Sequence, residues 1–149
     1  MDFDLDLAKE RSKKNPVYYV QYAAARCSSI LRKSEIRPAR RQGGNPKSEK
    51  KSNLQVLNLL NAPEEIALIK KILQLPEIIE DIAGDYQVHR FSRYAYELAQ
   101  TFTNFYEKHH VIDEKNADLT SARLFLVQVT LSSLRYTIAL MGIDAPERM

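Results

Sequence analysis

The sequence has little cysteine and little glycine, and it has no long apolar run. Cys27 is the single cysteine among 149 residues, which excludes an internal disulfide framework and is typical of the reducing cytoplasm. Only four glycines occur, so glycine-rich phosphate loops and turn-rich β folds are not expected. No apolar run is long enough to span a membrane, and the first residues are acidic where a signal peptide would be basic. We therefore expect a globular cytoplasmic protein.

Motifs that carry catalytic chemistry are also missing. The sequence contains no Walker loop, no glycine-rich dinucleotide turn and no CxxC pair. His109 and His110 are adjacent, and neighbouring residues on a helix point about 100° apart, so they do not converge on one metal ion. We therefore predict neither a catalytic residue nor a metal site in this chain.

The net charge of +3 is concentrated in one segment. Residues 33 to 53 hold seven lysines and arginines against two glutamates, a net charge of +5, which leaves −2 for the rest of the chain. Residues 34–53 also contain Pro38, Gly43-Gly44 and Asn45-Pro46 and show no apolar period, which predicts a flexible basic linker inside a single domain of residues 1–149. Its role is open between a solvated loop and a segment that contacts a partner.

The rest of the chain predicts helices. Asn15-Pro16 is a typical helix start, and an apolar seam of three- and four-residue spacing follows it; residues 5–14 are expected to form a separate short helix. Ala62-Pro63 predicts the start of another helix, and Pro76 interrupts its pattern. A further helix follows Pro76 and is expected to end at Gly84. The seam residues are Val17, Val20, Ala24, Cys27 and Leu31.

The second half of the chain predicts two long helices. One apolar stripe begins at Val88 and continues through Phe91, Ala95, Leu98, Phe102 and Phe105. A final helix is expected from about Leu119 to Met141, stopping at Gly142. Because it is apolar on two faces, we expect it at the centre of the bundle. The predicted fold is an all-α bundle of about five or six helices.

The side of the first long helix opposite the seam combines aromatic rings and cations. It contains Tyr18, Tyr22, Arg26, Ser29 and Lys33. In one interpretation the tyrosines pack on another helix and the cations are ordinary surface residues. In the other, a tyrosine stacks on an unpaired base and the cations hold phosphates, as in proteins that bind single-stranded RNA loops. Periodicity does not decide between the two.

At these residues the sequence resembles a known family. The segments Asp2 to Glu10 and Asn15 to Arg26 resemble the junction after the catalytic domain of bacterial arginyl-tRNA synthetases, which are class I enzymes. Separated segments of the second half resemble their C-terminal, DALR-type anticodon-binding domain. These segments are His89-Arg90, Tyr94, Glu97-Leu98-Ala99, Phe105-Tyr106, Ala122-Arg123-Leu124 and Gly142 to Met149. The sequence departs from the family at two positions, since the family usually has histidine where this chain has Ala24 and often has cysteine where it has His109.

The resemblance implies a function and a set of contacts. The family joins arginine to its tRNA with ATP and Mg in an upstream domain that this chain lacks, so the fragment is expected to be inactive alone and to have no cofactor of its own. The expected partners are the arginine tRNA, through its anticodon loop, and the catalytic domain of the same parent chain. We expect no membrane association, and we expect the protein to be a monomer. Predicted tRNA-binding residues are Tyr22, Arg26, Tyr106 and Met149, with Tyr18, Lys33 and Arg123.

A second hypothesis uses the same surface differently. The Tyr22 and Arg26 face is also suitable for binding a partner helix, which would make the chain a helical protein-interaction adaptor. RNA binding weakens steeply with salt because counterions are released, whereas an apolar helix-in-groove contact hardly changes. A salt titration therefore separates the two hypotheses.

Overall fold

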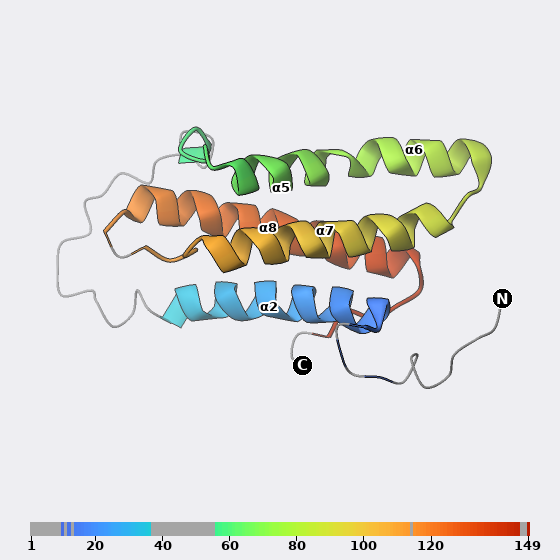
Figure 1. Ribbon diagram of the computed structural model, residues 1–149, viewed down its shortest axis with the longest axis horizontal. Coiled ribbons are helices and arrows are strands. Elements are labelled where there is room, and N and C mark those ends of the chain that lie inside the picture. Colours follow the sequence, from blue (N-terminus) through green and yellow to red (C-terminus); the bar gives the residue numbers. More distant parts are fainter. Residues whose placement is uncertain (1–9, 11, 13, 37–55, 114, 147–148) are drawn as a thin grey trace.

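The computed structural model describes residues 10, 12, 14–36, 56–113, 115–146 and 149, and it is all-α over these residues (Figure 1). The long helices of the described residues are α2 (Pro16–Ile36), α5 (Pro63–Leu73), α6 (Leu75–Asp85), α7 (His89–Lys108) and α8 (Ala117–Leu140). Since α5 and α6 share Gln74 as a flanking residue, the described part of the bundle consists of four rods, slightly fewer than the five or six helices expected. The predicted fold class is confirmed.

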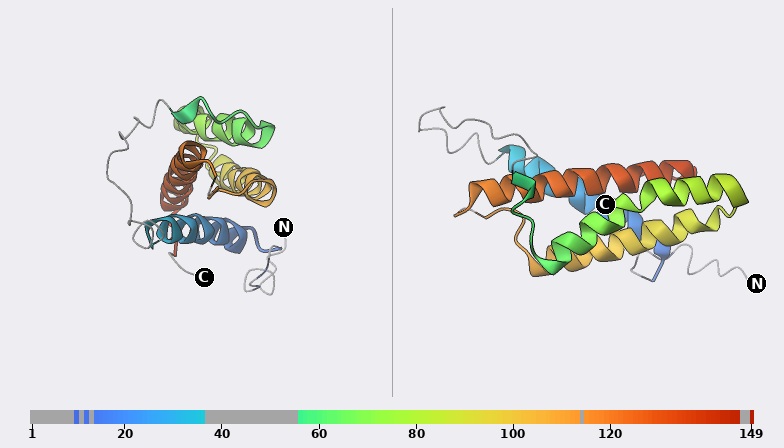
Figure 2. Two further views of the ribbon diagram at one scale, coloured as in Figure 1. Left: turned by 90° about the vertical axis from the view of Figure 1, so that its left-hand side faces the viewer. Right: turned by 90° about the horizontal axis from the view of Figure 1, so that it is seen from above.

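The rods form three layers. The rod made by α5 and α6 lies on one side, α7 and α8 form the middle layer, and α2 lies on the other side (Figures 1 and 2). The prediction that the last helix is the centre was wrong in part. Within the described chain α7 packs against all four other helices, whereas α8 packs against α2, α5 and α7. One of the two apolar faces expected on α8 ends in solvent, because Tyr136 and Leu140 are exposed.

The start of α2 follows the prediction. The Asn15 side-chain oxygen accepts a hydrogen bond from the Val17 amide at 3.1 Å, as a helix-capping residue does. The seam is buried from Val20 through Ala24 to Cys27, while Val17 is 46% exposed. The buried part of the seam therefore begins one turn later than its apolar pattern suggested.

The helix starts predicted from proline agree with the structure, whereas the two helix ends predicted from glycine differ from each other in outcome. Pro63 opens α5 and Pro76 lies in the first turn of α6, as expected. Gly84 does not end α6, which continues to Asp85, and Tyr86 takes the left-handed conformation with φ of 60°. In contrast, α8 ends at Leu140 and Gly142 has a φ of +72°. Such a conformation suits glycine, which has no Cβ.

The stripe predicted along α7 is confirmed from Phe91 to Phe105, all of it buried, whereas Val88 precedes the helix and is 66% exposed. Residues 34–36 belong to α2, so the predicted linker starts later than expected. The remainder of that linker and most of the expected helix at 5–14 lie outside the described residues. None of the described helices has the length and apolar character needed to cross a membrane.

Candidate nucleic-acid interface

An open groove lies between the second half of α2 and the end of α7. It has a volume of about 410 Å³, and we call it the aromatic groove. Five of the seven residues predicted to bind tRNA line it together, and they come from three distant parts of the sequence. These are Tyr22, Arg26, Lys33, Tyr106 and Met149; the other lining residues are Ala25, Ser29, Ile30 and Arg32.

Arg26 is the central residue of the aromatic groove. Its guanidinium carbon lies 4.9 Å from the centre of the Tyr22 ring and 4.8 Å from the centre of the Tyr106 ring. Its Nη2 also donates a 2.6 Å hydrogen bond to the Tyr22 hydroxyl. Such cation–π contacts hold a guanidinium in place without neutralising it. The arrangement therefore presents a positive charge between two aromatic rings.

Helix geometry and core packing place these side chains. Tyr22 and Arg26 are four residues apart and lie on one face of α2, above the buried Ala25 and Ile30. The Tyr19 hydroxyl contacts the Thr103 hydroxyl at 3.2 Å and joins α2 to α7. The rows of buried side chains on α7 fix the direction of Tyr106, which remains 36% exposed. The groove is therefore a product of the contact between α2 and α7.

The segment after α8 also returns to α2. The Gln21 side-chain amide donates a 2.7 Å hydrogen bond to the carbonyl of Asp144. This contact holds the segment against the same helix that carries Tyr22. It explains how Met149, which is distant in sequence from α2, lines the aromatic groove.

Two predicted residues lie outside the aromatic groove. Tyr18 is one turn away and stacks on Tyr22, with ring centres 6.5 Å apart and planes inclined by 14°. The side chain of Arg123 is only 11% exposed, and its Nε pairs with Glu65 at 2.7 Å. Its Nη1 donates to the His110 carbonyl at 2.8 Å. Two of the guanidinium nitrogens, Nε and Nη1, are therefore engaged within the protein.

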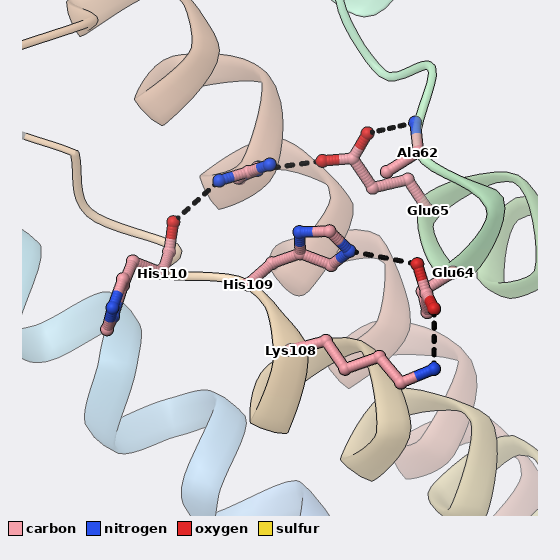
Figure 3. A network of polar contacts seen from close by, with 7 residues as sticks. Ala62, Glu64, Glu65, Lys108, His109 and His110 are labelled. Atoms are coloured by element: carbon pink, nitrogen blue, oxygen red, sulfur yellow. Dashed lines mark hydrogen bonds and ion pairs between the residues drawn. The ribbon is translucent and has the colours of Figure 1, made fainter.

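Arg123 belongs to a set of contacts that we call the ion-pair network, shown in Figure 3. Glu65 is 1% exposed, and its second oxygen accepts a 3.0 Å hydrogen bond from the Ala62 amide. Beside it, Glu64 pairs with Lys108 at 2.6 Å and with His109 at 3.0 Å. These two partners, Lys108 first, lower the pKa of Glu64 to about 2.

A second groove of about 410 Å³ adjoins the first, with which it shares Ile30, Lys33 and Tyr106. Our sequence interpretation missed this groove because it considered His109 and His110 only as metal ligands. No group of side chains suited to a metal ion is found in the described part of the chain. The remaining lining residues of the second groove are Glu107, His109, His110, Val111 and Ile112.

Arg32 is a further lining residue of the aromatic groove that we did not predict. It lies three positions after Ser29 on the same helix. A wider stripe drawn on the helical period would have included it, since residues three apart are neighbours on the surface of a helix.

Comparisons with known proteins identify the family. Residues 20–149 match the model of the DALR anticodon binding domain family. Over 149 residues the chain is 44% identical to the arginine–tRNA ligase of Citrifermentans bemidjiense, covering all of this chain and 25% of that protein.

Two solved structures are also similar. The arginyl-tRNA synthetase of Thermus thermophilus has a TM-score of 0.74, and that of Plasmodium falciparum has one of 0.71. Each is 28% identical over the whole of this chain, which covers 24% of each. The chain thus spans about a quarter of the length of these relatives.

Proposed function

The chain belongs to the DALR anticodon-binding domain family, and we propose that it binds the anticodon loop of an arginine tRNA as part of an arginine–tRNA ligase. The observation that carries this proposal is the aromatic groove, where Arg26 lies between Tyr22 and Tyr106. Unpaired RNA bases are recognised by stacking on aromatic rings and by hydrogen bonds to their edges, with cations on the phosphates. The groove offers all three.

The resting position of Arg26 suggests how binding proceeds. Its guanidinium covers part of both tyrosine rings, so a base that stacks there takes its place. Arg26 then turns to a phosphate or to the base edge, for which its planar fork of donors is suited. Lys33 and Arg32 at the rim of the groove are placed for neighbouring phosphates, and Met149 supplies an apolar contact on the other side. We propose Tyr18 as a support for the ring of Tyr22.

The remaining assignments follow from the relatives. Since the chain spans about a quarter of a ligase, we propose that ATP, Mg and arginine bind in the rest of the parent chain, and that this part acts with it as a cytoplasmic monomer. The purified chain should then show no ATP–pyrophosphate exchange. The net positive charge of residues 33–53 is suited to contact with the tRNA backbone.

A salt titration with two RNAs tests the proposal. Binding of the chain to an arginine tRNA transcript is measured beside a transcript in which only the middle base of the anticodon is changed. Affinity for the first should fall steeply with salt, and the changed base should weaken binding by roughly 1–3 kcal/mol, the usual contribution of one stacked base. Binding that ignores both salt and the anticodon would instead support the adaptor hypothesis, in which Tyr22 and Arg26 contact a partner helix.

A further inference from the structure

We propose that Glu64 of α5 increases the affinity of the aromatic groove for RNA, although a carboxylate by itself repels phosphates. Glu64 binds Lys108 and His109 at the end of α7, and we call these three residues the α7 clamp. The clamp holds Tyr106 in the position that a stacked base requires. Glu64 is thus a positioning residue, which acts through Tyr106 and not by touching the RNA. This inference rests on the proposed function and deepens it.

The α7 clamp joins α5 to the point where α7 ends. Lys108 is the last residue of α7, and His109 is its C-cap, where the backbone becomes extended. The Nζ of Lys108 lies 2.6 Å from one oxygen of Glu64, and the Nε2 of His109 lies 3.0 Å from the other (Figure 3). Each oxygen therefore has a partner of its own, and the two partners lie on either side of the helix end.

The α5 side of the clamp is itself anchored. Glu64 lies in the first turn of α5 beside Glu65, which is 1% exposed and pairs with Arg123 of α8 at 2.7 Å. The other oxygen of Glu65 accepts a 3.0 Å hydrogen bond from the amide of Ala62. Separating a nearly buried ion pair is costly, so the first turn of α5 is held in place. Glu64 therefore connects the end of α7 to a fixed point.

Tyr106 lies in the part of α7 that needs such support. It is two residues before the end of the helix, and the last turn of a helix lacks partners for its carbonyl groups and opens most readily. The Tyr106 ring is 36% exposed, and its centre lies 6.2 Å from that of Phe102 and 4.8 Å from the guanidinium carbon of Arg26. Opening of the last turn therefore removes this ring from the aromatic groove.

A row of packed rings also connects the clamp with Tyr106. The centre of the His109 ring lies 5.8 Å from that of Phe105, and Phe105 lies 6.5 Å from Phe102, which contacts Tyr106. Both phenylalanines are fully buried. Close-packed interiors transmit a displacement from one side chain to the next. A shift of the imidazole therefore reaches the ring that lines the groove.

The direction of the effect distinguishes the clamp from simple electrostatics. A side chain that is already in its bound position loses less freedom when the ligand arrives, so the clamp should strengthen binding. Electrostatics predicts the opposite, because removal of a negative charge near an RNA site favours a polyanion. Loss of Glu64 would in addition release the charge of Lys108. The sign of the change in affinity therefore decides between the two.

The test uses the 149-residue chain and the anticodon stem-loop of an arginine tRNA, with affinity measured by fluorescence anisotropy. Glu64→Gln and His109→Ala are each made in the wild type and in the Tyr106→Ala variant. Binding is measured at the highest salt at which it is still detected, where screening weakens the contribution of the released Lys108. Glu107→Gln is the matched control, because it removes an exposed carboxylate from the last turn of α7. Thermal melts show that each variant is folded.

The expected result is a loss of affinity that depends on Tyr106. Glu64→Gln and His109→Ala should each weaken binding by about two- to tenfold, as substitutions that act through neighbouring residues do. Both losses should disappear in the Tyr106→Ala variant, because the ring that the clamp positions is then absent. His109→Gln keeps a hydrogen-bond donor for Glu64 and should retain most of the affinity. Glu107→Gln should not weaken binding.

Other outcomes separate this inference from the proposed function. If Tyr106→Ala weakens binding but Glu64→Gln strengthens it or leaves it unchanged, Glu64 does not position the ring, although the aromatic groove binds RNA. Losses that persist in the Tyr106→Ala variant would mean that the clamp residues contact RNA directly, which also overturns the inference. If neither Tyr106→Ala nor Tyr22→Ala weakens binding, the proposed function itself is wrong.

Discussion

Two regions on either side of the end of α7 use arginine in opposite ways. In the aromatic groove, Arg26 lies over two tyrosine rings, and none of the described lining residues has an acidic side chain. In the ion-pair network, Arg123 pairs with the nearly buried Glu65. Tyr106 of the groove and Lys108 of the network are two residues apart, so the two environments are close neighbours in sequence. The contrast arises because α7 places the ring of Tyr106 beside Arg26, whereas α5 places the carboxylate of Glu65 beside Arg123.

The difference shows how one residue type serves binding in one place and stability in another. A buried carboxylate needs its cation, because separating them leaves an uncompensated charge away from water. A guanidinium on an aromatic ring keeps its charge and can exchange the ring for a phosphate. We therefore expect replacement of Arg123 to alter folding and replacement of Arg26 to alter RNA binding.

The largest effect should come from Arg123→Ala, which leaves Glu65 buried without its partner. We expect a loss of about 3–5 kcal/mol in the free energy of unfolding, measured by urea denaturation. Arg93→Ala is the control, because Arg93 is an exposed arginine paired with Glu97 on its own helix, where such pairs contribute under about 1 kcal/mol. Equal losses in both variants would show that burial of Glu65 is not what matters.

Next in size is Tyr22→Ala, which removes a ring from the aromatic groove. It should weaken tRNA binding by roughly 1–3 kcal/mol, as expected for one stacked base, and leave the melting transition nearly unchanged because Tyr22 is only half-buried. Tyr22→Phe keeps the ring, loses only the hydroxyl that contacts Arg26, and should retain most of the affinity. An unfolded Tyr22→Ala variant would mean that the ring belongs to the core.

A smaller effect is expected from Arg26→Ala. It should weaken RNA binding and lower the slope of log affinity against log salt by about one, the value for one phosphate contact. Arg26→Lys should keep the slope, because the charge remains, while losing the planar contact with Tyr22 and Tyr106. A slope that is the same in the alanine variant and the wild type would mean that Arg26 stays on the rings in the complex.

The smallest effect concerns Glu64 and acid. Lys108 and His109 lower its pKa in the folded state from 4.5 to about 2, so its contribution to stability is complete above pH 4.5 and is lost as the pH falls towards 2. The difference in melting temperature between the wild type and Glu64→Gln should therefore shrink over this range. Glu77→Gln, an exposed control on α6, should show no such trend. A constant difference for Glu64→Gln would contradict the ion pair.

Much of the fold was predictable because its signals are local. The Asn15 cap, the Pro63 start, the Gly142 stop and the stripe along α7 all depend on residues within a few turns of one another. Tyr22 and Arg26 were found for the same reason, since both lie on one face of one helix. Two local signals were misleading. The helix continues one residue past Gly84, and the apolar seam of α2 includes Val17, which the tertiary structure leaves exposed.

The sequence by itself determined the helices, the apolar face of each and the resemblance to a family. Only the tertiary structure decided that Tyr106 and Met149 join Tyr22 at one groove, that Arg123 pairs with Glu65, and that a second groove lies beyond Tyr106. The physical reason is that helical periodicity gives the direction of a side chain from its own axis. Which side chain it meets depends on how the ridges of two helices pack together, and that involves residues distant in the sequence.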